Sequence, residues 1–175
     1  MKAKKAGEIM IPLDRYPHIP HWFTLRQAIA ELRASQIEVE GRKSLPRAVL
    51  VFSKAYELLG IVRRRDILRG LQPSFLSAES MEYKRRLFEV ETDPNLFDLT
   101  SDKLLSALRE QAERPVSDIM LPITATVDYD DHIMKVIHEM VKNDISFLPV
   151  IKDGGVVGVA RSVDVLNEIA DIVLA

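Results

Sequence analysis

The chain contains an internal repeat, and a repeat constrains the possible folds more strongly than any local pattern. Residues 8–12 (Glu-Ile-Met-Ile-Pro) match residues 118–122 (Asp-Ile-Met-Leu-Pro). Residues 60–66 match residues 158–164, because both segments begin with a glycine and two hydrophobic residues and end with an aspartate. The separation between matching residues falls from 110 in the first block to 98 in the last, so the first copy holds 12 extra residues. The sequence therefore predicts two copies of one module.

Each copy is predicted to have the element order β-α-β-β-α. Hydrophobic residues follow the spacing of an amphipathic helix in both copies, at Leu25, Ala28, Ile29 and Leu32 and at Ile133, Val136, Ile137 and Met140. Two β-rich runs follow each helix, at 47–52 and 58–62 and again at 147–151 and 156–160. A second helix begins near Asp66 in the first copy and near Ser162 in the second. The predicted fold class is α+β.

The repeat divides the chain into three predicted segments. Residues 1–70 form the first repeat, residues 71–114 form a mostly helical connection, and residues 115–175 form the second repeat. Most of the extra residues lie between Gln36 and Leu45, a glycine-containing polar stretch that we interpret as an enlarged loop.

These blocks resemble a tandem pair of cystathionine-β-synthase (CBS) domains, the arrangement called a Bateman module. The resemblance rests on the Ile-Met-hydrophobic-Pro entry, the order of helix and hairpin, and the Gly-hydrophobic-hydrophobic-x-x-x-Asp segment in both copies. It implies a pseudo-twofold pair with two clefts between the copies. It also implies that AMP, ADP or ATP binds there as a regulatory ligand, that the chain forms a homodimer, and that its output goes through an unidentified effector protein.

The repeated glycine and aspartate suit a nucleotide chemically. Gly60 and Gly158 let the backbone approach a ligand closely. A carboxylate accepts a hydrogen bond from each ribose hydroxyl, and the resemblance places Asp66 and Asp164 on riboses. Free amides at the start of the following helix favour phosphate. The same aspartates also suit plain helix capping, and that alternative stays open.

The resemblance extends the two candidate sites to neighbouring residues. Adenine is expected against the first strand of each copy, around Tyr16-Pro17 and Thr124-Ala125. Arg64 is expected to reach a phosphate. Ser162 is expected to cap its helix, which would leave Asp164 for the ligand.

Two arginines depart from the family pattern. The family has threonine or serine three residues before the aspartate, whereas this chain has Arg63 and Arg161. One interpretation is that each arginine grips a phosphate with its planar fork. The other is that each arginine pairs with its own aspartate, Asp66 or Asp164, and closes the cleft. The second interpretation leaves a ligand-free interaction scaffold as the alternative function.

Other functional classes lack support in the sequence. The chain has no cysteine, no zinc-type histidine motif and no phosphate-binding Gly-Lys-Ser/Thr loop, so we expect neither a metal site nor an enzyme. A net charge of -2 gives no reason to expect nucleic acid. The longest apolar runs are strand-sized and no secretory signal is present, so we expect a cytoplasmic protein that does not bind a membrane.

Overall fold

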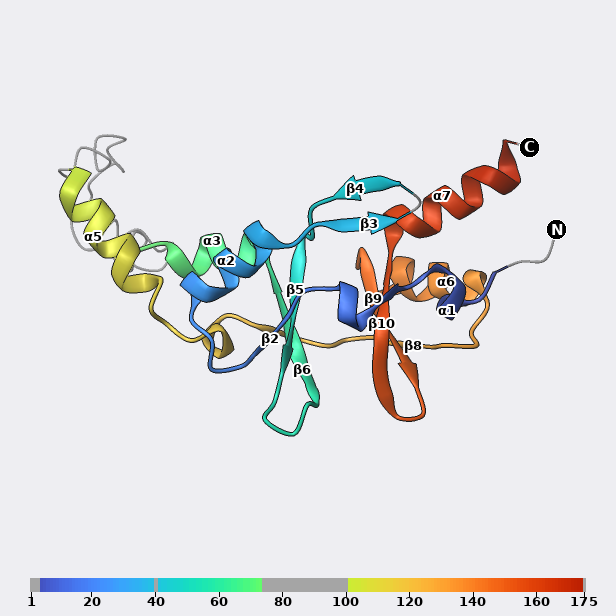
Figure 1. The fold of residues 1–175 in the computed structure, drawn as a ribbon, viewed down its shortest axis with the longest axis horizontal. Helices are drawn as coiled ribbons and strands as arrows, with labels where there is room; N and C mark the ends of the chain where they lie inside the picture. Colours follow the sequence, from blue (N-terminus) through green and yellow to red (C-terminus); the bar gives the residue numbers. More distant parts are fainter. Residues whose placement is uncertain (1–3, 40, 74–100, 175) are drawn as a thin grey trace, which may run out of the picture.

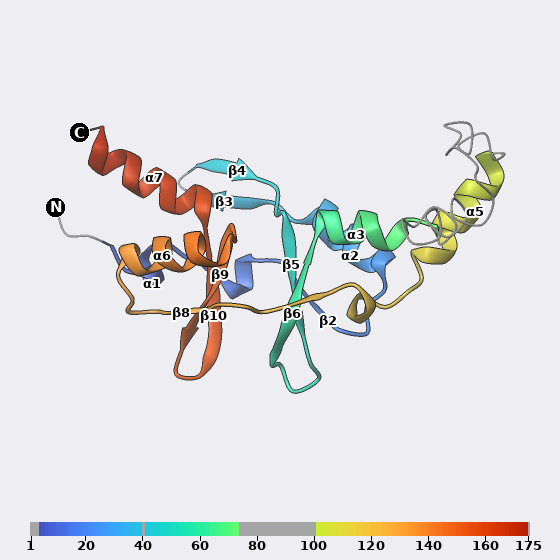
Figure 2. The same ribbon diagram turned by 180° about the vertical axis from the view of Figure 1, so that it is seen from behind.

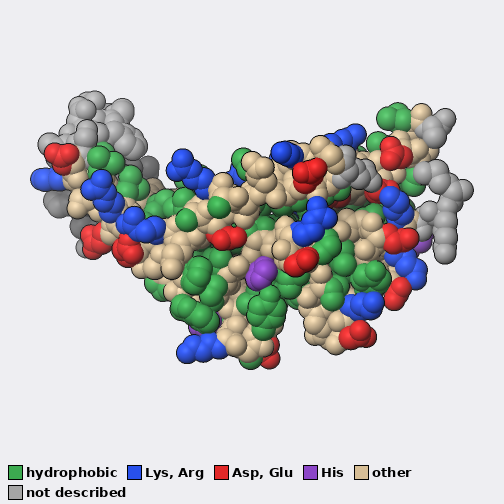
Figure 3. Space-filling view, in the orientation of Figure 1, with side chains coloured by type: hydrophobic (Ala, Val, Ile, Leu, Met, Phe, Trp, Pro, Cys, Tyr) green, Lys and Arg blue, Asp and Glu red, His purple; other side chains and the backbone are tan. Residues whose placement is uncertain are grey.

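The computed structural model describes residues 4–39, 41–73 and 101–174. Two four-stranded sheets stand side by side at the centre of the molecule, and helices lie on the outer side of each sheet (Figure 1). The two halves appear as adjoining lobes with a notch between their lower ends (Figure 3). The α+β fold class and the pairing of two similar halves are therefore confirmed.

The first sheet has the strand order β2-β5-β6-β7. Its strands are β2 (His18–Pro20), β5 (Ala48–Phe52), β6 (Leu58–Arg63) and β7 (Leu121–Pro122). The helices α2 (Leu25–Ala34) and α3 (Arg64–Leu71) cover its outer face. Thr24 starts α2 with a capping box, in which its hydroxyl accepts from the Gln27 amide and the Gln27 side chain accepts in return.

The second sheet has the matching order β1-β10-β9-β8. Its strands are β1 (Ile11–Pro12), β8 (Val127–Asp128), β9 (Phe147–Lys152) and β10 (Gly155–Arg161). Its outer face is covered by α1 (Ala6–Ile9), α6 (Ile133–Asn143) and α7 (Ser162–Val173).

The strand β5 is buried on both faces, and successive side chains point to opposite sides of a strand. In β5, Val49 and Val51 pack with the helices of the first half, whereas Leu50 and Phe52 pack in a separate cluster between the two sheets. Val159 of β10 joins that central cluster from the other side. The apolar run over residues 48–52 therefore forms two cores at once, one inside its own half and one between the halves.

The two halves exchange their first strands. Pro12 of β1 pairs with Gly158 of the second sheet, and Pro122 of β7 pairs with Gly60 of the first sheet. A Cβ atom on Gly158 would lie 2.4 Å from the carbonyl oxygen of Ile11, and one on Gly60 would lie equally close to Leu121. The glycines of the repeated motif are therefore required by the crossing strand. The predicted division at residues 70 and 115 follows the sequence repeat, while each packing unit takes its first segment from the other copy.

A hairpin and two 3-10 turns lie outside the two four-stranded sheets and their helices. The extra residues of the first copy form a β-hairpin of β3 (Ile37–Val39) and β4 (Arg42–Ser44), where the sequence predicted only an enlarged loop. Gly41 sits at its tip with a φ of 76°, a backbone conformation that glycine adopts without strain. One 3-10 turn, at Leu13–Arg15, follows the exchanged strand β1, and another, at Val116–Asp118, precedes the exchanged strand β7.

The predicted helical connection lies partly within the described residues. The helix α5 (Ser101–Gln111) belongs to it, and residues 74–100 lie outside the described part of the chain. Among the described residues, no helix combines the length and apolar character that crossing a membrane requires.

Candidate functional site

A cleft of ≈ 660 Å³ lies between the two halves, and we call it the open cleft. Its lining residues are Ile61, Arg63, Leu121, Pro122, Thr124, Met140, Val141, Asp144, Ile145, Ser146, Phe147 and Ser162. Ile61 and Arg63 come from the end of β6 in the first copy, and all the others come from the second copy. The exchange of first strands explains this combination, because β7 carries the segment around Thr124 to the edge of β6.

Three predicted site residues, Arg63, Thr124 and Ser162, line the open cleft. The sequence predicted that the Gly…Asp motif of each copy and the segments at Tyr16-Pro17 and Thr124-Ala125 contact ligand. It did not predict which of these segments shares a cleft with which motif. In the structure the pairing is crossed, because Thr124 of the second copy lies with Arg63 of the first. Ala125 does not line the cleft and packs instead against the core of the second half.

Arg63 is bound to its own aspartate at the edge of the open cleft. Its Nε lies 2.9 Å from Asp66 Oδ2 and its Nη2 lies 3.0 Å from Asp66 Oδ1, a two-point contact. The backbone amide of Arg63 and the Arg69 side chain donate to the same carboxylate at 3.0 and 3.3 Å. Burial alone would raise the pKa of Asp66, but the hydrogen bonds from Arg63 outweigh it and hold the pKa below its ordinary value of 3.8.

The two partners of this pair differ in accessibility. The Asp66 side chain is fully buried, whereas 46% of the Arg63 side chain is exposed. Both Asp66 oxygens are occupied, so contact with a ribose requires Arg63 to release them. Arg63 Nη1 has no hydrogen-bond partner among the described residues, which leaves one donor of the guanidinium for an anion in the cleft.

The second motif has the same ion pair in a more enclosed place. Arg161 Nε lies 2.6 Å from Asp164 Oδ2, and Arg161 Nη2 lies 2.8 Å from Asp164 Oδ1. The third nitrogen, Nη1, donates to the Ser44 hydroxyl at 2.8 Å. Only 13% of the Arg161 side chain is exposed. Tyr16 is buried beside this pair, and burial raises the pKa of its phenol to about 12.

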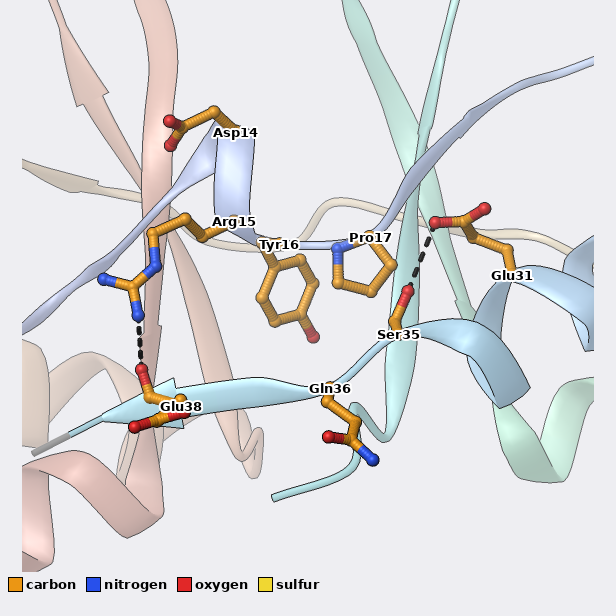
Figure 4. Close-up of a pocket in the computed structure, with 8 residues that line it drawn as sticks. All are labelled: Asp14, Arg15, Tyr16, Pro17, Glu31, Ser35, Gln36 and Glu38. Carbon is orange, nitrogen blue, oxygen red and sulfur yellow. Dashed lines mark hydrogen bonds between the residues drawn. The ribbon is translucent and has the colours of Figure 1, made fainter. Parts of the chain in front are cut away.

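A smaller cavity of ≈ 320 Å³ lies beside Tyr16, and all the residues that line it belong to the first copy (Figure 4). Tyr16 and Pro17, the predicted adenine contacts of this side, lie on its wall together with Asp14, Arg15, Glu31, Ser35, Gln36 and Glu38. Arg15 donates to the backbone carbonyl of Glu38, and the Ser35 hydroxyl donates to Glu31 at 3.2 Å. We call this region the hairpin-filled cleft, because β3 forms one of its walls.

The capping prediction for Ser162 is wrong, and Arg64 lies outside both cavities. Ser162 is the first residue of α7 and lines the open cleft, but Arg161 occupies the capping position and no side chain caps the helix. The Ser162 amide donates to the Ser146 carbonyl at 2.8 Å, so it is not free for a phosphate. Arg64 is exposed and lines neither cavity, and its amide donates to the Arg47 carbonyl.

The largest part of the open cleft was not predicted from the sequence. The segment from Met140 to Phe147 turns out of α6 at Asp144, whose φ of 51° is left-handed, and forms one whole wall. An αL residue after a helix is a common way to end it, but aspartate is not the usual glycine. The described residues contain no group of three or more acidic or histidine side chains that could hold a metal ion.

Comparisons with known proteins agree with this geometry. Residues 116–171 match the CBS domain. No curated protein matches the sequence. The CBS domain of a CBS domain-containing membrane protein from Sphaerobacter thermophilus is 18% identical, with a TM-score of 0.64 over 94% of this chain and 87% of that one.

Two similar structures contain nucleotides. CBSX2 in complex with AMP is 15% identical, with a TM-score of 0.60 over 96% of this chain and 97% of the other. The cytosolic domain of the Mg2+ channel MgtE in complex with ATP is 20% identical, with a TM-score of 0.58 over 93% of this chain and 48% of the other. The resemblance stated from the sequence is therefore confirmed: residues 116–171 match the CBS domain, and the chain has the fold of CBS-domain structures, which is consistent with a tandem CBS pair.

Proposed function

We propose that this chain is a regulatory CBS-pair protein that binds one adenine nucleotide in the open cleft. The observation that carries the proposal is the cleft itself, which is walled by both halves and holds a half-exposed Arg63 at its edge. Its volume lies within the roughly 300–1,000 Å³ typical of small-molecule sites. The complexes of CBSX2 with AMP and of MgtE with ATP support an adenine nucleotide as the ligand class.

The lining residues suggest how the ligand is held. Ile61, Ile145 and Phe147 offer an apolar surface for the base, and Thr124 offers a hydroxyl for its polar edge. Arg63 binds phosphate through its planar fork. When phosphate takes Arg63, the carboxylate of Asp66 loses its main partner and becomes available to the ribose hydroxyls. Nucleotide binding thus exchanges one charged partner of Arg63 for another, which avoids leaving a buried charge unpaired.

The output is proposed to be a change in the relative position of the two halves. A ligand shifts such an equilibrium only by its difference in affinity for the two arrangements. A ligand that contacts β6 on one side and residues 140–147 on the other meets that requirement, because its contacts change when the halves move. We propose a regulatory rather than catalytic role, with an effector protein as the recipient.

The outer helices support the proposed homodimer. Leu68 of α3 and Leu166 of α7 occupy equivalent places in the two copies, and 69% and 66% of their side chains are exposed. Large apolar side chains in matched exposed positions mark an interaction surface. A second copy of the chain, related by a twofold axis, presents the same pair of leucines and can cover both.

A ligand-free scaffold is the second candidate. It is favoured by the ion pairs in both copies, since Arg63 occupies Asp66 and Arg161 occupies Asp164. If that state is permanent, the fold would serve only to bring partner surfaces together.

Calorimetric titration of ATP, AMP and adenosine separates the two candidates. We expect ATP binding to weaken by roughly ten- to a hundredfold in Arg63→Thr, because a hydrogen bond to a charged group contributes about 1.5–3 kcal/mol. Adenosine has no phosphate for Arg63 to bind, and in Arg63→Thr its ribose can reach the freed Asp66, so its binding should not weaken. Arg161→Thr is the matched control in the hairpin-filled cleft and should leave ATP binding at the open cleft unchanged.

Two other outcomes count against this scheme. Tighter binding of both ATP and adenosine to Arg63→Thr would mean that the arginine only blocks the cleft. No binding heat for any adenine ligand, with the native chain or with Arg63→Thr, would defeat nucleotide binding and leave the scaffold.

A further inference from the structure

The two clefts are made unequal by one insertion. Residues 35–47 join α2 to β5 in the first copy, whereas only residues 144–146 join α6 to β9 in the second. The short connection lines the open cleft. The long connection occupies the equivalent position beside the second motif, and there it folds into the β3–β4 hairpin.

The hairpin leaves its own half and lies on the other one. Both views show it extending from α2 across to the start of α7 (Figures 1 and 2). Ile37 is 1% exposed and packs in the cluster that contains Ile11 and Val159 of the second sheet. Val39 packs against the same cluster. The hairpin is therefore anchored by apolar burial as well as by its polar contact.

The polar contact falls on the arginine of the second motif. Ser44 accepts from Arg161 Nη1, so all three nitrogens of that guanidinium have partners from the chain itself. At the open cleft only two nitrogens of Arg63 have described partners. The exposed fractions follow the same order, with 13% of the Arg161 side chain exposed and 46% of the Arg63 side chain. A hydroxyl of the chain thus takes the place that a ligand oxygen would take.

We propose that the β3–β4 hairpin is a permanent internal occupant of the second cleft, so that each chain offers one nucleotide site instead of two. The proposal rests on the proposed function for the identity of the ligand. The occupancy of the cleft by the hairpin does not depend on it. Burial of Ile37 and the bond to Ser44 together fix the hairpin, and the cavity left beside Tyr16 is about half the volume of the open cleft.

The test is the number of ATP molecules bound per chain, measured by calorimetry on the full-length protein. In a short-connection variant, residues 35–47 are replaced by Asp-Ile-Ser, the sequence of residues 144–146. We expect one ATP per native chain and two per short-connection chain. Adding Arg161→Thr to the short-connection variant should weaken ATP binding at the second motif at least tenfold. Adding Arg63→Thr instead should weaken ATP binding in the open cleft.

A full-length variant covers the case in which the short chain does not fold. The double substitution Ile37→Ala and Ser44→Ala removes both anchors and keeps the chain length, so a second, weaker ATP event should appear. Retention of structure is checked by circular dichroism. Two ATP molecules on the native chain would overturn the proposal, as would a single event in every folded variant.

Two results keep the proposal apart from the proposed function. In the first result, the native chain binds no ATP, the short-connection variant binds one, and adding Arg161→Thr to that variant abolishes the binding. This result supports the hairpin as internal occupant and contradicts nucleotide binding at the open cleft. Hydrogen exchange of residues 37–44 should not change when ATP is added to the native chain. Faster exchange with ATP would show that the nucleotide displaces the hairpin, which contradicts permanent occupancy.

Discussion

Replacing the buried carboxylate of Asp66 with an amide, Asp66→Asn, tests the central interaction of the candidate site. Asp66 is fully buried at the start of α3 and accepts four hydrogen bonds, three from Arg63 and one from Arg69. Asparagine keeps the shape and one acceptor oxygen. It removes the negative charge and turns two N–H donors toward the two arginines.

The expected loss of stability depends on how many of the lost hydrogen bonds of Arg63 and Arg69 are replaced by hydrogen bonds to water. Hydrogen bonds to charged groups contribute about 1.5–3 kcal/mol each, but such values do not add within one network. The side chains of Arg63 and Arg69 are 46% and 61% exposed, so water takes over most of their donors. The loss should therefore stay below the roughly 3–5 kcal/mol measured for breaking fully buried pairs. We expect Asp66→Asn to lower the free energy of unfolding by about 2–3 kcal/mol.

Urea unfolding followed by the fluorescence of Trp22, the single tryptophan, measures this loss. With a urea dependence of about 2 kcal/mol per molar, the midpoint should fall by about 1–1.5 M. Asp118→Asn is the control, because Asp118 forms an i,i+4 pair with Arg114 in which both side chains are more than 40% exposed. Exposed pairs contribute about 0–1 kcal/mol, so its midpoint should move by less than about 0.5 M.

The pH dependence gives a second check on the same carboxylate. The folded-state pKa of Asp66 lies below its ordinary value of 3.8, so the folded protein binds this proton less readily than the unfolded chain. The stabilisation is complete above that ordinary value and is lost as the pH falls through the folded-state pKa. The native protein and Asp66→Asn should therefore converge in stability below about pH 4. Equal midpoints at pH 7, or a difference that widens on acidification, would refute the assigned role of the pair.

Three further outcomes are expected. Gly158→Ala should destabilise the chain by at least about 2 kcal/mol in urea unfolding, because its Cβ would collide with the Ile11 carbonyl; an unchanged midpoint would contradict the strand exchange. Leu68→Glu combined with Leu166→Glu should convert the proposed homodimer to monomers in light scattering, and a native chain that is already monomeric at micromolar concentration would contradict the dimer. In an alkaline titration followed by tyrosine absorbance, the native protein should show a component with its midpoint near pH 12 that Tyr16→Phe lacks. If the component that Tyr16→Phe lacks has its midpoint near pH 10, this phenol is exposed.

The sequence predicted those parts of the fold that depend on local pattern and on repetition. The β-rich run at 47–52 contains the strand β5, the run at 147–151 covers all of β9 but its last residue, and the helical spacing from Leu25 to Leu32 falls within α2. The repeat allowed the fold to be predicted from these local patterns, because two copies with the same order of elements indicate two similar halves. The nature of the arginine contacts was left open between two interpretations, and the structure contains the ion pairs of the second.

The long-range arrangement was not predictable in the same way. Nothing in the segment around Ile11 indicates that it pairs with β10 of the other copy, because strand pairing depends on the whole topology. The β3–β4 hairpin was missed because its polar residues and Gly41 are typical of a loop. Ile37 and Val39 are the residues of β3 that pack in or against the central cluster, and two apolar residues are too few to establish a strand period.

The difference between the two clefts limits how the chain can respond to a ligand. Two equal clefts in one chain can bind cooperatively, because filling the first changes the position of the halves that the second requires. If the hairpin occupies the second cleft as proposed, one chain has one nucleotide site and its own binding curve is hyperbolic. Any cooperativity must then arise between chains, and the matched Leu68 and Leu166 surfaces of the outer helices offer the route for it. ATP titrations of the native chain should therefore have a Hill coefficient of one wherever light scattering finds a monomer, and a larger coefficient in a monomer would require a second site within the chain.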